Sequence, residues 1–421
     1  MVPMFKFLDK AGIRAMFDDT LGERHPRAEY SNSDMLLGWI ATVHTQGYRL
    51  SRLEETKEDL FFLGLNVCSP DTMGRFLKNM AFENRHVNYW NPKKKKTIIN
   101  HYTVSENSLL VNLLVNSTKN MGGFSERGPK ILDFDSTPLY SENLESKRIY
   151  KGGVGYSAMV GMINKSVVYV DQRSGNAPPE FETQESLEKC LKVLSQHEIP
   201  IDLIRSDGGG YTKKVTNFIQ SKGIKFLIGA DWANRTYSLC QEHVKYWRKA
   251  KIKTYNTTWN AEVASFPFSF AGEANEYRMI AVRAKNIEDK KNKKIAKWTK
   301  VGDYHYKFIL TNDLESSEYD LTLSYHKRGG FERNFDYLKN DFGWKILPFS
   351  HMNENLPYLI VCALANNTYR AFLRIVALTF EKIKITFRLG TFLRKFIKGT
   401  VDITNGKYDF SRAKIDYEKI M

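Results

Sequence analysis

The spacing of apolar residues divides the chain into a helical first part and a longer second part in which strands and helices alternate. As far as about residue 122, apolar side chains recur at intervals of three and four positions, which predicts helices. Two helix starts are strongly marked, at Ser33-Asp34 and at Ser69-Pro70-Asp71, where a capping side chain precedes the apolar positions. The helix after Ser69 and the helix before it form the pattern of a helix-turn-helix, which any antiparallel helix pair also produces.

From about residue 129 the apolar spacing becomes that of strands. The expected elements are strands at 131–135, 156–163 and 166–170, a helix at 183–196, a strand at 201–206, a helix at 212–221 and a strand at 224–228. Asn164-Lys165 predicts a tight hairpin turn between the second and third strands. Three antiparallel strands followed by alternating strands and helices predict an α/β fold with a mixed sheet.

The remaining residues divide into an insertion, a return to the first pattern and a tail. Residues 231–305 contain short strands between polar turns and hold four of the seven tryptophans, which predicts a β-rich insertion subdomain. A strand at 306–311, a helix at 325–339 and a long apolar helix at 354–378 follow. The expected units are a helical domain (1–122), an α/β domain in two parts (123–230 and 306–380), the insertion (231–305) and a basic tail (381–421).

The composition of the chain indicates which kind of partner it binds. Lysine and arginine total 63 against 47 acidic residues, a net charge of +16, which predicts binding to a polyanion, most commonly nucleic acid. Arg75 and Lys78 of the expected helix-turn-helix are then candidate DNA contacts, and the run Lys93 to Lys96 is a solvated loop or a phosphate contact. Four scattered cysteines exclude a disulfide framework, and no apolar run is long enough to cross a membrane, so we expect an intracellular protein.

Two aspartates stand where strands of the expected sheet end. Asp135 closes the strand 131–135, and Asp207 follows the strand 201–206 and precedes three glycines. In a mixed sheet these strands can be neighbours, which would bring both carboxylates to one edge, where the active sites of open sheets lie. Asp133 faces the same side as Asp135 and is the alternative first acid. Asp207 alone would equally suit a turn.

A third acid lies in the stretch from Tyr325 to Lys339. Glu332 comes seven positions after Tyr325, four after Arg328 and seven before Lys339. On one helix the four side chains would fall within an arc of about 60°. A carboxylate on that face can bind a divalent metal, and the other three groups can bind phosphate oxygens. The alternative is a solvated face with charge pairs between neighbouring turns.

Two glycines, Gly329 and Gly330, interrupt this stretch and would cost a helix about 2 kcal/mol. Either the helix begins after them, which would take Tyr325 and Arg328 off the shared face, or the backbone there lies close to DNA.

Three convergent carboxylates repel one another and are stable mainly around divalent cations. Ligand sets made only of oxygen select Mg²⁺ or Mn²⁺ rather than zinc. Two such ions about 4 Å apart activate a water or hydroxyl and stabilise the leaving oxygen of a phosphodiester. The sequence therefore predicts a two-ion Mg²⁺ site, with Mn²⁺ as the substitute, held by Asp135, Asp207 and Glu332.

These residues together resemble the DDE transposases of bacterial insertion sequences. The likeness rests on Asp135-Ser136-Thr137 after an apolar strand, on Arg205-Ser206-Asp207-Gly208, and on the tyrosine-arginine-glutamate-lysine signature, matched in full spacing by Tyr325, Arg328, Glu332 and Lys339. It covers about residues 129–378 well and the first helices loosely. The resemblance implies an RNase H-like catalytic domain, a β-rich insertion between the second and third acids, and a helical DNA-binding domain before them.

The resemblance also implies a cut-and-paste transposase, in which water and then a 3′-hydroxyl attack a phosphodiester. The three acids would be the catalytic metal ligands, and Tyr325, Arg328 and Lys339 would bind phosphates of the transposon end. Relatives form a DNA hairpin and stack a flipped base on a tryptophan of the insertion. Trp259 and Trp298 are the candidates here, with core packing as the alternative for each.

The expected partners are the inverted-repeat ends and the target DNA, bound by a homodimer in the bacterial cytosol at the nucleoid. Two other functions fit the same residues. One is an RNase H-like nuclease that hydrolyses DNA without strand transfer. The other is a domesticated, non-catalytic DNA-binding protein, which would be expected to lack an acid, whereas all three are present.

Overall fold

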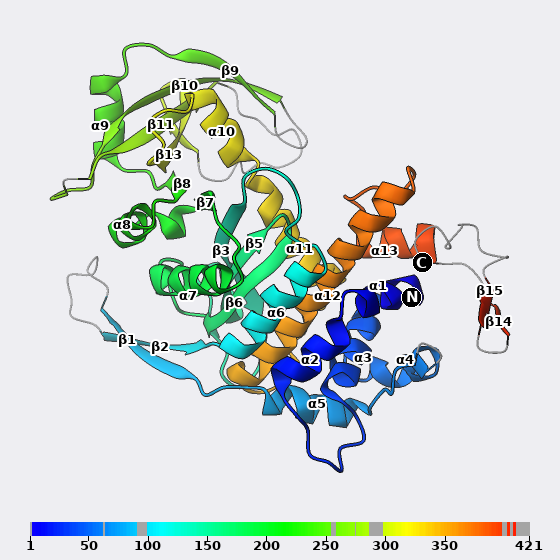
Figure 1. The fold of residues 1–421 in the computed structure, drawn as a ribbon. Coiled ribbons are helices and arrows are strands. Elements are labelled where there is room, and N and C mark those ends of the chain that lie inside the picture. Colours follow the sequence, from blue (N-terminus) through cyan, green and yellow to red (C-terminus); the bar gives the residue numbers. More distant parts are fainter. Residues whose placement is uncertain are drawn as a thin grey trace.

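One mixed sheet runs through most of the molecule (Figure 1). The computed structural model describes residues 2–61, 64–90, 99–253, 258–273, 275–285, 298–397, 402–404 and 407–409. In these residues thirteen strands belong to this sheet, and eleven follow one another in the order β1-β2-β6-β5-β3-β7-β8-β13-β11-β10-β9. The α/β fold with a mixed sheet is therefore confirmed.

Five strands form the centre of the sheet. They are β3 (Ile131–Tyr140), β5 (Val154–Ile163), β6 (Ser166–Ser174), β7 (Leu203–Ser206) and β8 (Lys225–Ala230). β3, β5 and β6 pair antiparallel, whereas β7 runs parallel to β3 and β8 parallel to β7. Asn164 and Lys165 have positive φ angles of 49° and 72°, as a two-residue hairpin turn of the predicted type requires.

Helices cover this centre. They are α6 (Ser108–Asn120), α7 (Thr183–Gln196), α8 (Lys213–Ser221) and α12 (Met352–Thr379). α12 is apolar on nearly every side because it is buried along most of its length. Its Asn367 bonds to both the N–H and the carbonyl of Val167 on β6, at 2.8 and 2.7 Å, so a buried amide joins the helix to the sheet.

The first helices pack on the side of α12 away from the sheet (Figure 1). They are α1 (Val2–Lys10), α2 (Ile13–Leu21), α3 (Asn32–His44), α4 (Arg52–Phe61) and α5 (Pro70–Asn79). The predicted start of α5 is confirmed, because the Ser69 side chain accepts a hydrogen bond from the backbone N–H of Thr72 and Pro70 occupies the first turn. The start of α3 lies slightly earlier than expected, with Ser31 as the cap and Asp34 completing a capping box.

The expectation that residues 1–122 are helical is wrong between α5 and α6. Two strands lie there, β1 (Arg85–Trp90) and β2 (Ile99–Ser105), and β2 pairs with β6. The reason is a small apolar cluster in which Tyr102 and Val104, two positions apart, pack with Phe181. Residues 91–98, which include the predicted lysine run, lie outside the described part of the chain.

The insertion shares the sheet of the central strands. Its elements are α9 (Asn234–His243), β9 (Arg248–Lys253), β10 (Thr258–Phe268), β11 (Tyr277–Ala284) and β12 (Thr299–Val301). They are followed by β13 (Tyr304–Thr311), which pairs antiparallel with β8, so hydrogen bonds run without a break from the central strands into the insertion. The strands expected in this region are therefore present, joined edge to edge with the central ones.

The single helix expected over 325–339 is instead two. α10 (Glu318–His326) ends before Lys327, and α11 (Gly329–Asp341) begins at the glycine pair. The N–H groups of Arg328 and Phe331 bond to carbonyls three residues back, which tightens the junction. The shared helix face derived from one continuous helix therefore does not exist, and the residues of the signature meet through tertiary contacts.

The chain closes with short elements. These are α13 (Leu389–Phe392), the π-helical turn Leu393–Ile397, and the two-stranded pair β14 (Asp402–Thr404) and β15 (Lys407–Asp409). No helix in the described ranges is both long and apolar enough to span a bilayer.

Candidate active site

The register between β3 and β7 brings the first two acids together. Ile131, Leu132 and Asp133 pair with Leu203, Ile204 and Arg205, so the same parallel register carried two residues further sets Asp135 opposite Asp207. Asp135 does not end its strand as expected, because residues 136–140 continue to pair with β5. Asp135 lies instead at the position where β7 ends and β3 no longer pairs with it.

The two carboxyl groups influence each other. Burial raises the pKa of Asp135, and the negative charge of Asp207 raises it further. The side chain of Asp135 is only 11% exposed, so water does little to screen this repulsion. Two adjacent carboxylates in such surroundings need positive charge close by.

Asp207 also shapes the turn that follows it. Its Oδ1 accepts a hydrogen bond from the backbone N–H of Gly209 at 2.8 Å, and residues 208–210 form one 3₁₀ turn. A Cβ atom added to Gly208 would lie 2.5 Å from Oδ1 of Asp231, so a larger residue at this position would displace that carboxylate. The turn-forming role predicted as an alternative is therefore present.

Asp133, the alternative first acid, is held by another group. The Arg205 guanidinium donates two hydrogen bonds of 2.7 Å to its two oxygens. The same arginine donates to the carbonyl of Ser324, at 2.7 Å, and so joins β3, β7 and α10. This bidentate ion pair satisfies the carboxylate of Asp133 without a metal, which favours Asp135 as the first acid.

Arg328 supplies positive charge to the acidic pair. It stands at the junction of α10 and α11 and donates to Oδ2 of Asp135 at 2.9 Å, with only 10% of its side chain exposed. Burial alone would lower the pKa of this guanidinium, but the nearby charges of Asp135, Asp207 and Glu332 raise it. All three predicted acids therefore lie near one arginine.

Glu332 approaches the other two acids less closely. It occupies the first turn of α11 and is exposed. Among the described residues, no three acidic, histidine or cysteine side chains lie close enough to hold one metal ion. The structure thus brings Asp135 and Asp207 together and leaves Glu332 at the rim, with Arg328 contacting the pair.

The other two signature residues contact the catalytic strands directly. The Lys339 ammonium donates to Thr137 Oγ1 and to the carbonyl of Pro138, both at 2.7 Å, and so reaches β3 just beyond Asp135. Tyr325 is buried, and its hydroxyl occupies the place that a side chain at Gly229 would need. The backbone of Asp207 is close to that same position, so Gly229 makes room for Tyr325 beside the second acid.

The remaining predicted DNA contacts differ in their surroundings. Arg75 is exposed on α5, whereas Lys78 of the same helix pairs with Glu354 of α12 at 3.2 Å. Trp298 is half-buried and packs beside the apolar cluster of the insertion sheet, as the core alternative predicted. The side chain of Trp259 lies outside the described residues.

Sequence reasoning missed two residues beside the acids, Arg205 and Asp231. Arg205 stands within the quoted stretch before Asp207, but nothing local pairs it with Asp133, 72 positions earlier. Asp231 follows β8 as Asp207 follows β7, which is the signal that could have found it.

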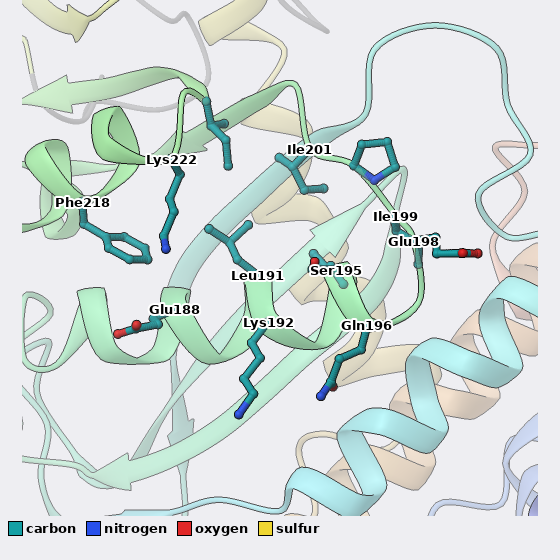
Figure 2. Close-up of a pocket in the computed structure, with 13 residues that line it drawn as sticks. Glu188, Leu191, Lys192, Ser195, Gln196, Glu198, Ile199, Ile201, Phe218 and Lys222 are labelled. Atoms are coloured by element: carbon teal, nitrogen blue, oxygen red, sulfur yellow. The ribbon is translucent and has the colours of Figure 1, made fainter.

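A separate cavity of about 790 Å³ lies between α7, α8 and the loop before β7 (Figure 2). Its lining is largely apolar, with Leu191, Ile201 and Phe218 among the contributors. It adjoins the amino end of β7, and none of the predicted site residues lines it. The acids therefore occupy the other end of the strand.

The fold brings Asp135 and Asp207 together at the carboxyl end of neighbouring parallel strands, with Arg328 bonded to Asp135. This arrangement suits an enzyme that acts on phosphodiesters with the help of divalent metals. The family model described as "Transposase DDE domain group 1" matches residues 4–407, and the chain belongs to this family of DDE transposases. It is thus a DNA transposase, a cut-and-paste enzyme whose class uses divalent metal ions to cleave DNA and transfer strands.

Comparison with solved structures gives a more distant likeness. A cryo-EM structure of the piggyBac transposase synaptic complex with hairpin DNA is 11% identical, with a TM-score of 0.44 over 93% of this chain and 78% of that one. A search of curated proteins found no match.

Proposed function

We propose that Asp135, Asp207 and Glu332 are the three metal-binding acids of this transposase, and that β3, β5, β6, β7 and β8 form its RNase H-like catalytic core. The order and directions of these strands support the core. The observation that carries the site is the β3–β7 register, which sets Asp135 beside Asp207.

The residues fit divalent cations. Burial and the charge of Asp207 raise the pKa of the Asp135 carboxyl, and such a pair becomes stable when a cation lies between the two groups. A donor set made only of oxygen suits Mg²⁺ or Mn²⁺. We propose two such ions, with Glu332 completing the ligand set from the first turn of α11. The ions would activate the attacking oxygen and stabilise the leaving one.

The side chains around the acids would position the DNA. Arg328 presents a planar fork suited to two phosphate oxygens, and release from Asp135 would free it for that role. Lys339 would act as a point charge beside the scissile strand. Tyr325, buried between Gly229 and Arg328, would fix the guanidinium and the turn that carries it.

The reaction balances with water and DNA alone. A water oxygen bonds to phosphorus, the bond from phosphorus to the 3′-oxygen breaks, and that oxygen leaves as a 3′-hydroxyl after taking up a proton. The 3′-hydroxyl then attacks a second phosphodiester, which conserves the number of phosphodiester bonds. If the opposite strand is the target of that attack, the product is a hairpin on the transposon end. A second water must then break the hairpin phosphodiester and restore the 3′-hydroxyl, which can join to the target.

The organisation of the enzyme on DNA is part of the same proposal. Residues 1–122, with helices α1 to α5 and exposed Arg75, would bind the inverted-repeat ends of a bacterial insertion sequence, and a homodimer would hold two ends together at the nucleoid. Trp298, which is half-buried against the insertion sheet, is the described tryptophan that we propose for stacking a flipped base.

Cleavage of matched DNA tests the proposal. The protein is incubated with a duplex carrying an end of its own element, with Mg²⁺, Mn²⁺ or Ca²⁺, and the strands are separated under denaturing conditions. We expect a nick at the transposon end, then a strand of double length from the hairpin, then joining to supercoiled target. Cuts without joining would indicate a nuclease, and binding without cuts a domesticated DNA-binding protein.

Lys339 offers a prediction with a matched control. Burial, together with repulsion from Lys151 and Lys345, lowers the pKa of its ammonium to about 8. The charge is therefore present below about pH 8 and lost above it. We expect end-DNA affinity of the wild type to fall between about pH 7.5 and 9, and that of Lys339→Arg, which stays charged, to fall much less.

The salt dependence of DNA binding is a second test of the role of Lys339. Lys339→Ala should flatten the slope of affinity against salt by about one unit. An equal pH response of wild type and Lys339→Arg, measured by fluorescence anisotropy, would contradict a phosphate contact at this position.

A further inference from the structure

The segment between β3 and β5 carries basic side chains that are exposed and lie near Lys339. Four residues form the group called the hairpin patch from here on: Lys147, Arg148, Lys151 and Lys345. The first three lie in the hairpin formed by β4 (Lys147–Arg148) and the start of β5, and Lys345 follows α11. All four are exposed.

The hairpin patch continues the line of basic groups that begins at the acids. Lys339 bonds to Thr137 and Pro138 on β3, which ends at Tyr140, and a short loop leads from there to β4 at Lys147. Lys151 and Lys345 are close enough to Lys339 for their charges to act on it. Positive groups from three segments therefore converge on the same side of β3.

The hairpin is anchored, which fixes where its charges stand. Asn143 donates to the carbonyls of Leu347 and Phe349, at 3.2 and 2.6 Å. The Glu145 carboxylate accepts from the backbone N–H of Met352 at 2.7 Å, at the start of α12. A Cβ atom added to Gly175 would lie 2.6 Å from the carbonyl oxygen of Lys147, so the hairpin backbone lies directly against the loop after β6.

The acidic residues of the same segment do not neutralise the patch. Glu145 is occupied by the start of α12, where it also pairs with His351 at 3.1 Å. Glu142 is exposed, and it is the other acid of the segment. Exposed Tyr140 and Tyr150 stand among the basic groups, with the Lys151 ammonium 5.4 Å from the centre of the Tyr150 ring. Basic groups interleaved with exposed aromatic rings are typical of surfaces that bind nucleic acid.

We propose that the hairpin patch binds the phosphodiester backbone of DNA as that DNA leaves the active site. This rests on the proposed function, because the location of the patch matters only if Asp135 and Asp207 mark the scissile bond. Two stretches of DNA have this chemistry, the flank of the transposon end and the target. Both are bound through phosphates, so the patch contributes affinity without reading sequence.

Charge reversal tests the patch. In Arg148→Glu/Lys151→Glu both side chains are exposed and neither is used in the fold, so the unfolding midpoint should match that of the wild type. We expect binding to DNA to weaken about tenfold or more at physiological salt, and the salt slope to flatten by about two units. The matched control is Lys192→Glu, an exposed lysine of α7 at the cavity of Figure 2.

Two arms of the experiment distinguish whether the patch binds the flank of the transposon end or the target DNA. Loss of binding and nicking on flanked end duplexes, with normal joining of pre-cut ends to target, assigns the patch to the flank. Normal nicking with a loss of joining of about tenfold or more assigns it to the target. Affinities and yields in both arms equal to those of Lys192→Glu would overturn the proposal. A wild type that neither binds nor cuts end DNA would instead refute the proposed function.

Discussion

Replacement of Asp207 by asparagine is expected to abolish strand cleavage while DNA binding is preserved. The amide keeps the size of the side chain and can still accept the hydrogen bond from Gly209, so the turn should persist. It removes the negative charge that would hold a metal beside Asp135. We expect cleavage to fall by at least about a thousandfold, a loss of roughly 4 kcal/mol of transition-state stabilisation.

The affinity of this variant for end DNA should equal or slightly exceed that of the wild type, because one negative charge near the phosphates is gone. Nicking of a labelled end duplex measures the first effect, and a binding titration in Ca²⁺ the second. Cleavage at the wild-type rate in Mg²⁺ would exclude Asp207 from the ligand set. Loss of binding together with cleavage would point to a damaged fold.

Replacement of Arg205 by methionine should have the largest effect on stability. It would leave the buried carboxylate of Asp133 without its partner and release the carbonyl of Ser324. Breaking a buried pair from one side costs about 3 kcal/mol or more. We expect a clear fall in the urea midpoint, followed by tryptophan fluorescence.

The double variant Asp133→Leu/Arg205→Met serves as the control for this effect. It contains no unpaired buried charge, so it should recover most of the lost stability. Asp133→Asn answers a separate question, because it keeps Arg205 in contact with Ser324. It should retain cleavage, in contrast to Asp207→Asn. Complete inactivity of a variant whose urea midpoint is close to that of the wild type would make Asp133 rather than Asp135 the first acid.

Features set by neighbouring residues were predicted well from the sequence. The Asn164-Lys165 turn and the helix at 183–196 agree with the structure because turn chemistry and apolar spacing are local signals. The sequence allowed β3 and β7 to be neighbours in a mixed sheet, and the structure shows that they pair. If the two strands were neighbours, Asp135 and Asp207 were expected at the same edge of the sheet, although no distance could be predicted.

Features set by distant partners were not predictable in the same way. β1 and β2 form because β2 meets β6 and Phe181, neither of which is near in sequence. The break between α10 and α11 had a local warning in its two glycines. The pairing of Arg205 with Asp133 had none, since a hydrophobic strand with one arginine predicts only that the charge needs a partner.

The hydrogen-bonded continuity from β8 into β13 and β11 limits how this transposase can be made smaller. A designer who wished to deliver a compact version would look first at residues 231–305. Their removal would leave β13 as an uncovered sheet margin with apolar Phe308, Ile309 and Leu310 in its middle. An exposed apolar edge strand of this kind pairs with strands of other chains and leads to aggregation. A shortened enzyme would therefore need a substitute strand or charged residues along β13 to remain monodisperse.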